Sequence, residues 1–170
     1  MRTQFNWYKA PFAKTTHVFH NEKHIAYLKT IIPIKLIHGK INDQYYHFHI
    51  KAWLSSFIDI FNPDTQQTEG RIRINFFAGK AIIRTKEGER FFWQFEKGYR
   101  NRWFLTDEKG DRIIYKGNIR KGLIEPFFIN DLAALTGLFI RNYIQQFFLM
   151  LVIINLIMIL IVTVYFQLFL

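Results

Sequence analysis

Three clusters of basic residues in the body of the chain are suited to binding anionic phospholipid headgroups. They are Arg71, Arg73, Lys97, Arg100, Arg102, Lys116, Arg120 and Lys121. A lysine or arginine close to an anionic bilayer contributes about 1 kcal/mol of attraction, and the tryptophan and tyrosine residues near these clusters are typical of a membrane interface. The alternative interpretation is a solvated basic surface that only determines membrane topology.

The overall charge is compatible with a second class of partner, nucleic acid. Lysine and arginine number 23 against 13 aspartate and glutamate residues, which gives a net charge of +10. Proteins that bind single strands combine such charge with aromatic residues on which bases stack. We expect no nucleic-acid partner, because the C-terminal part of the chain predicts attachment to a membrane.

Histidines offer a further possible chemistry, metal binding. His17, His20 and His24 have the spacing of one helical face, but their neighbours favour a strand, which would divide them between two faces. His47 and His49 share a strand face, with one carboxylate in the preceding turn as the only candidate third ligand. We therefore expect surface histidines and no metal site.

Catalytic and cofactor-binding motifs are absent from the sequence. It contains no nucleophile elbow, zinc-protease helix, phosphate-binding loop or dinucleotide fingerprint. The lack of cysteine excludes disulfides, thiolate metal sites and a cysteine nucleophile. We expect no enzymatic activity and no cofactor.

The end of the chain has the composition of a membrane span. Arg141 is the last charged residue, and residues 147–170 are interrupted by only four polar or tyrosine positions. As a helix this segment is about 36 Å long, enough for a hydrocarbon core of about 30 Å. We expect a single-pass C-terminal tail anchor, with the basic bulk of the chain in the cytoplasm. The alternative is a helix buried in a soluble domain, but such helices are usually shorter and amphipathic.

Three residues of this terminal segment have expected roles in or near the membrane. Arg141 and Tyr143 are predicted to anchor the helix at the membrane interface. Asn155 lies in mid-span, where a hydrogen bond to another helix contributes about 0.6 to 2 kcal/mol. Such a bond would support a homo-oligomer or docking on a membrane protein partner; the alternative is a tolerated polar residue.

The body of the chain has the pattern of short antiparallel strands. Turn signals recur about every ten residues, and between them aromatic and β-branched residues alternate with polar ones, as Ile72 and Ile74 do with Arg71 and Arg73. Period-two alternation indicates half-buried strands, and the regular short spacing indicates a barrel or a sandwich. We predict a mainly β fold, an antiparallel meander of roughly ten to twelve short strands followed by one long hydrophobic helix.

Two parts of the sequence carry a resemblance to a known fold. The hairpin of residues 102–114, its continuation Tyr115-Lys116-Gly117-Asn118 and the apolar segment 132–143 resemble the tubby-like C-terminal fold, which LURP-one-related proteins and phospholipid scramblases share. The similarity extends over residues 15–146 and lies in architecture and rhythm. In that fold the C-terminal helix threads a closed β-barrel.

The resemblance implies a location for the first part of the long helix. Residues 131–146 would be the plug, with Ala133, Ala134 and Gly137 small enough to pass between converging strands. The apolar residues from Phe147 onward depart from the family's shape, because they exceed what a barrel of short strands can cover. The similarity to scramblases also implies an effect on lipids.

These observations predict four segments. Residues 1–14 form an N-terminal arm, 15–130 the β-barrel, 131–146 a helix threading or leaving the barrel, and 147–170 the transmembrane helix. The expected function is that of a non-enzymatic membrane protein whose barrel contacts the lipid bilayer or recruits a partner. The alternatives are a structural subunit of a larger membrane complex and a soluble barrel that encloses its own helix.

Overall fold

The computed structural model describes residues 4–31, 36–52, 55–99, 101–126 and 130–169. Twelve strands and one helix lie in this described part of the chain. They are β1 (Phe5–Tyr8), β2 (Thr15–His20), β3 (Lys23–Ile31), β4 (Leu36–Ile41), β5 (Gln44–Ile50), β6 (Phe57–Asn62), β7 (Gln67–Asn75), β8 (Lys80–Thr85), β9 (Arg90–Phe95), β10 (Arg102–Thr106), β11 (Arg112–Gly117), β12 (Lys121–Pro126) and α1 (Asp131–Phe169).

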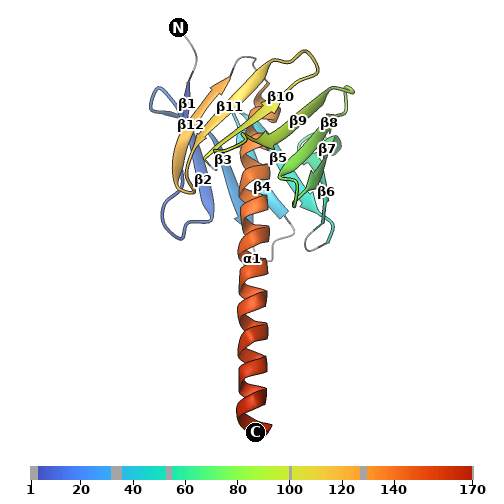
Figure 1. Cartoon of the computed structure of the whole chain (residues 1–170). Helices are drawn as coiled ribbons and strands as arrows, with labels where there is room; N and C mark the ends of the chain where they lie inside the picture. The colour runs from blue at the N-terminus through green and yellow to red at the C-terminus, as the bar shows by residue number, and fades with distance from the viewer. Residues whose placement is uncertain (1–3, 32–35, 53–54, 100, 127–129, 170) are drawn as a thin grey trace.

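The strands form one closed barrel around the start of the helix (Figure 1). Each strand pairs antiparallel with the next along the chain, and β1 pairs with β12 to close the sheet. Closure leaves no free sheet edge. The predicted fold class, a mainly β meander closing into a barrel with one long C-terminal helix, is confirmed, and the sandwich is excluded.

The barrel begins earlier than the sequence pattern indicates. Residues 5–8 fall within the expected N-terminal arm, but they form β1, which pairs with β12 through Phe5 to Tyr8 and with β2 through Asn6 to Tyr8. Trp7 of this strand points into the core with 1% of its surface exposed. The strand has only four residues, too few for a clear alternation, and its pairing with β12 is a long-range contact.

Alternation along the strands places the apolar residues inside. In β7, Ile72 and Ile74 are buried, whereas Arg71 and Arg73 point outward. Strand β9 departs from this pattern because Phe92 also points outward and is 43% exposed. The interior is thus lined by β-branched and aromatic side chains that need a partner at the barrel axis.

The first part of α1 fills the barrel axis. The side chain of Asn130 accepts a hydrogen bond of 2.9 Å from the backbone N–H of Ala133 and so caps the helix. Leu138, Phe139 and Ile140 are fully buried, and the ring of Phe139 stacks on Phe48 of β5 at 4.1 Å. This hydrophobic contact between helix and wall makes the barrel and the helix one core.

Two barrel side chains bind the backbone of α1. Trp93 Nε1 donates to the carbonyl oxygen of Gly137 at 3.0 Å, and the Tyr115 hydroxyl donates to that of Ala134 at 2.9 Å. Burial raises the pKa of Tyr115, which therefore remains a donor at neutral pH. These two bonds set the height of the helix along the barrel axis.

The two ends of the barrel are defined by this helix. At the far end, where α1 begins, Asn130 Nδ2 donates to Glu89 in the β8–β9 turn. At the exit end, where α1 leaves, the Tyr143 hydroxyl donates to the carbonyl oxygen of Ser55 between β5 and β6. Because consecutive strands are antiparallel, the connections after odd-numbered strands lie at the exit end and those after even-numbered strands at the far end.

Candidate membrane-contact site

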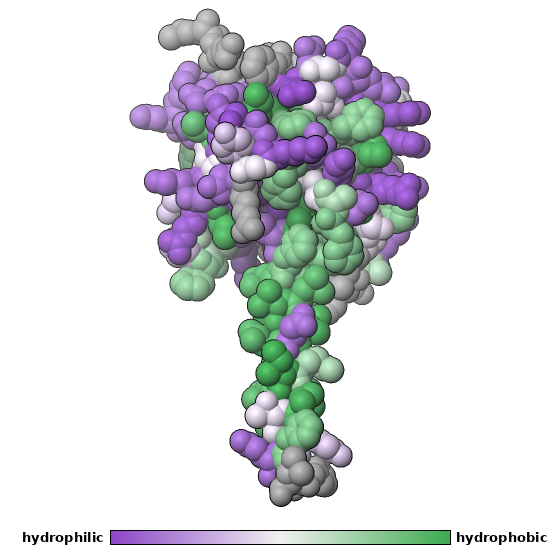
Figure 2. All heavy atoms as spheres, in the orientation of Figure 1, coloured by the Kyte–Doolittle hydropathy of each residue, from purple (hydrophilic) through white to green (hydrophobic). Residues whose placement is uncertain are grey.

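Beyond the barrel, α1 continues as an exposed apolar rod. Phe147 is the last of its residues in the buried core, and every side chain from Val152 to Gln167 is exposed. Residues 148–169 span about 33 Å. Within the described residues, α1 is the one helix long and apolar enough to cross a membrane, by length and composition. Figure 2 shows the contrast between the hydrophilic barrel and the hydrophobic helix below it.

The exit end carries apolar side chains at the tips of its turns. Phe12, Phe77, Tyr99 and Ile119 lie in four different connections and are each more than half exposed. Phe12 is completely exposed and has a positive φ of 59°, a conformation that is costly for a bulky residue. Phe77 also packs edge-on against Phe147, at the point where the helix leaves the barrel. Exposed aromatic residues around an apolar helix match the side chains found at membrane interfaces.

Charge is distributed unequally between the two ends. In the described connections of the exit end, one carboxylate, Glu96, stands against five cations. The cations are Lys9, Lys14, Lys51, Lys97 and Arg120. In the described turns of the far end, eight carboxylates stand against Lys86 and Lys109. The carboxylates are Glu22, Asp43, Asp64, Glu87, Glu89, Asp107, Glu108 and Asp111. An anionic surface therefore attracts the exit end and repels the far end.

Three of the predicted headgroup residues are exposed at the exit end. Lys97 lies in the β9–β10 connection, and Arg120 and Lys121 lie at the β11–β12 turn. None of the three forms an ion pair within the described part of the chain. Arg100 lies outside the described residues. The structure thus brings together, at one end, residues that are far apart in the sequence.

Two further predicted residues at this end already have anionic partners. Arg102 Nε lies 2.9 Å from Glu96 Oε2, with its guanidinium over the ring of Tyr99. Lys116 Nζ donates to both carboxylate oxygens of Glu125, at 2.8 and 2.9 Å. These cations are partly neutralised, so their attraction for an anionic ligand is weaker than that of an unpaired residue.

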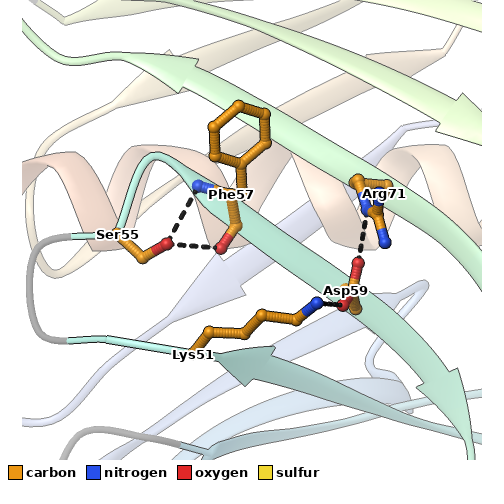
Figure 3. A network of polar contacts seen from close by, with 5 residues as sticks. All are labelled: Lys51, Ser55, Phe57, Asp59 and Arg71. Carbon is orange, nitrogen blue, oxygen red and sulfur yellow. Dashed lines mark hydrogen bonds and ion pairs between the residues drawn. The ribbon is translucent and has the colours of Figure 1, made fainter.

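Arg71 lies on the outer wall, further from the exit end than Arg73. Its Nε donates to Asp59 at 2.6 Å, and Lys51 binds the other oxygen of the same carboxylate at 2.8 Å (Figure 3). Partial burial of Asp59 opposes its ionisation, but the bonds from Lys51 and Arg71 outweigh this and lower its pKa. Asp59 therefore remains ionised and keeps its ion pair with Arg71 on the outer face of the barrel.

The outer wall above Phe77 contains an apolar groove. It has a volume of about 750 Å³ and includes the outward-facing Phe57, Ile82 and Phe92. These residues are neighbours in register, with Arg73 between Phe57 and Ile82 and its guanidinium over the Phe57 ring. No carboxylate is present among the described residues that line the groove. It extends the apolar surface of the exit end up one side of the barrel.

The two predicted interface anchors lie inside the barrel, which corrects their expected role. Arg141 is 3% exposed and Tyr143 is 5% exposed. The guanidinium of Arg141 lies between the rings of Trp7 and Trp103. The reason is the depth of the plug: the barrel encloses α1 as far as Phe147, about 9 Å beyond Arg141 along the helix axis. Exposed aromatic side chains lie on the turns of the exit end instead.

Asn155 lies on the exposed part of α1, as predicted. Its Nδ2 donates to the carbonyl oxygen of Leu151 at 2.7 Å, one turn earlier in the same helix. One amide N–H is therefore satisfied internally, while the Oδ1 atom and the second N–H remain for a neighbouring helix. Thr163 makes a similar bond to Ile159.

Five of the six histidines, His17, His24, His38, His47 and His49, lie on the outer face of β2 to β5, whereas the ring of His20 packs against Phe5. His38 and His47 are partners in register, with ring centroids 4.1 Å apart, and His17 and His24 are linked by a nitrogen–nitrogen contact of 3.0 Å. Across the residues that the structure describes, no group of three or more potential metal ligands converges. His49 stacks on His47 with a centroid distance of 6.1 Å.

Sequence reasoning missed the exposed turn tips. Phe12 and Phe77 adjoin turn residues, and Ile119 occupies a turn whose neighbours are polar and basic. A large apolar residue inside a turn is itself unusual, and this signal was available in the sequence. What the sequence did not provide was the knowledge that these turns all lie at the end from which the helix emerges.

Comparisons with known proteins provide no relative for this chain. No family model matches it, and neither a curated protein nor a solved structure is similar to it. The resemblance to the tubby-like fold therefore remains a prediction.

Proposed function

We propose that this chain is a non-enzymatic, single-pass membrane protein whose barrel is seated by its exit end on an anionic bilayer surface. There it contacts lipid headgroups and holds the rest of the barrel where a partner can bind. The observation that carries the proposal is the coincidence, around one helix exit, of exposed apolar tips and an excess of cations. Each feature alone has an ordinary explanation, but together they match the chemistry of a membrane interface.

The energetics favour a barrel whose exit end rests on the bilayer over a barrel held away from the bilayer surface. Two tips of the size of Phe12 and Phe77 each gain about 1.5 to 3 kcal/mol if fully buried, and partial insertion at the interface yields a fraction of this. Several cations add about 1 kcal/mol each near an anionic leaflet. The positive-inside rule supports a cytoplasmic barrel as part of this proposal, since the basic exit end directly precedes the proposed span.

The absence of cysteine makes a direct test possible, because any introduced cysteine is unique. Phe77→Cys places an environment-sensitive fluorophore at the exit end, and Asp64→Cys is the matched control at the far end. The full chain is reconstituted in phosphatidylcholine vesicles with and without phosphatidylglycerol. We expect lipid-borne spin labels to quench the fluorophore at position 77 and not at 64, with stronger quenching in the anionic vesicles.

Two results would count against the proposal. Equal quenching at both positions would mean that the barrel has no preferred orientation. Quenching at position 77 that is the same with and without phosphatidylglycerol, and insensitive to 1 M salt, would remove the contribution of anionic lipid, because the Debye length at that ionic strength is only about 3 Å.

A further inference from the structure

The barrel interior near the exit end contains a buried cation without an anionic partner. Arg141 of α1 is 3% exposed, and its guanidinium carbon lies 5.4 Å from the ring centroid of Trp7 and 4.9 Å from that of Trp103. The two aromatic faces stabilise the positive charge. Within the described residues, no carboxylate forms an ion pair with Arg141. Buried charges are normally paired.

The polar atoms around this cation are unpaired donors. Arg141 Nη1, Trp7 Nε1 and Trp103 Nε1 are all buried and lack a hydrogen-bond partner. A guanidinium and an indole only donate, so the group that would satisfy them must be an acceptor. Thr136 and Gln146 also carry unpaired oxygens, but each is five residues from Arg141 and therefore about 140° away around the helix.

A second cation lies at the same end of the barrel, next to the strand that carries Trp7. Lys9 directly follows β1, two residues beyond Trp7, and its backbone N–H donates to the carbonyl oxygen of Arg120 at 2.6 Å. Burial lowers the pKa of Lys9, and the charge of Arg141 lowers it further. An anion bound between the two cations would relieve this repulsion.

We propose that the exit-end mouth of the barrel, between Lys9 and Arg141, is a binding site for a phosphate oxyanion. The mouth faces the side of the molecule from which the helix leaves, so the phosphate of an anionic phospholipid is one source and free phosphate is the other. The lipid source rests on the proposed function; the site itself does not. Because the guanidinium is nearly covered, entry of the anion requires side chains at the mouth to move aside.

Titration of the full chain in neutral maltoside micelles tests the site. Inorganic phosphate is added in one series and dihexanoyl phosphatidylglycerol in another, while thermal unfolding is followed by tryptophan fluorescence. We expect a saturable rise of the unfolding midpoint by several degrees, because a ligand that binds only the folded state stabilises it. If inorganic phosphate raises the midpoint, free phosphate is a sufficient ligand. If only dihexanoyl phosphatidylglycerol raises it, the ligand is the phospholipid headgroup.

Variants locate the response. Lys9→Gln should weaken the apparent affinity about tenfold, and Arg141→Gln should abolish saturation. Lys14→Gln is the matched control, because Lys14 lies in the same β1–β2 connection but seven residues beyond Trp7, whose ring contacts Arg141. If Arg141→Gln does not fold, Lys9→Gln still decides the question, since Lys9 is outside the core.

Three results would overturn the site: no midpoint shift with either ligand, a shift that does not saturate, or a shift that Lys9→Gln and Lys14→Gln reduce equally. The first would mean that the two tryptophan rings satisfy Arg141 by themselves. Quenching of the fluorophore at position 77 distinguishes this failure from that of the proposed function, because seating on the bilayer does not require an anion in the barrel mouth.

Discussion

The hydroxyl of Tyr115 occupies the space that a Cβ atom on Gly137 would need. From this position it donates to the carbonyl oxygen of Ala134, while Trp93 donates to the carbonyl oxygen of Gly137 itself. The missing side chain therefore lets the wall of the barrel reach the backbone of the helix. The two hydrogen bonds fix the position of α1 along the barrel axis, and this position determines where the exposed apolar part of the helix begins.

Gly137→Ala should destabilise the chain, although alanine is the better helix former. Helix propensity alone favours alanine by about 1 kcal/mol, whereas overpacking a dense core costs about 1 to 3 kcal/mol. The buried Tyr115 ring has no room to retreat, which places the cost near the upper end of this range, so we expect a net loss of up to about 2 kcal/mol. Chemical unfolding of the full chain in detergent measures this.

The companion variant for this test is Tyr115→Phe combined with Gly137→Ala. Removing the hydroxyl relieves the closest contact but leaves the Tyr115 ring carbon Cζ 2.6 Å from the new Cβ. The double variant should therefore be less destabilised than the sum of the two single variants, but still less stable than the original chain. A Gly137→Ala chain as stable as the original would contradict the packing described here.

The strands were predictable because each carries its own local signal. Ile72 and Ile74 alternate with arginines, and this period of two identifies one buried face whatever the rest of the chain does. Strand β1 had no such signal: in four residues only Trp7 is fully buried. Its place is determined by pairing with β12, more than a hundred residues later, and no local pattern contains that contact.

The candidate site was predictable only in part, for a related reason. The candidate span follows from a continuous apolar run, which composition alone reveals. Arg141, by contrast, stands at the start of that run, where an interface residue is normal. Whether it meets headgroups or tryptophan rings depends on how deeply the helix is inserted, and that depth is set by Tyr115 and Gly137.

Acidification should destabilise the barrel through the paired rings of His38 and His47. Burial lowers the pKa of both histidines. The charges of Lys29 and His49 lower the pKa of His38 further. Those of His38 and His49 lower the pKa of His47, and Asp64 opposes this shift. The folded state thus favours neutral rings, so their contribution is complete above the unfolded pKa of about 6.5 and is lost as the pH falls below it. Thermal midpoints recorded between pH 7.5 and 5 measure the effect.

His47→Gln should flatten this pH dependence, since it removes one ring of the pair. Lys40→Gln, an outward-facing change on the neighbouring strand β4, is the control and should keep the original slope. A midpoint that rises as the pH falls through this range would mean that the pair favours protonation in the folded state.

Two arginines in the exposed rod should prevent membrane insertion. Ile157 and Ile161 lie on the exposed part of α1, and arginine near a span centre costs about 2.5 to 3.5 kcal/mol. Ile157→Arg with Ile161→Arg should therefore move the chain from the membrane fraction to the carbonate supernatant, while alanine at both positions keeps it membrane-bound. Flotation on a density gradient separates insertion from aggregation. Release of the unmodified chain by carbonate would refute the span.

Asn155→Leu should weaken association between copies of the chain, or between the chain and a membrane partner. Leu151 satisfies only one of the amide N–H groups of Asn155, and the remaining polar atoms face lipid unless another helix binds them. An interhelical hydrogen bond of about 0.6 to 2 kcal/mol corresponds to a loss of about 3- to 30-fold in association.

Thr163→Val is the matched control, because the hydroxyl of Thr163 is bonded to Ile159 in its own helix. Cross-linking in vesicles at several protein-to-lipid ratios gives the comparison. If Asn155→Leu and Thr163→Val leave the same dimer fraction as the original chain, the internal bond to Leu151 is sufficient and the rod acts only as an anchor.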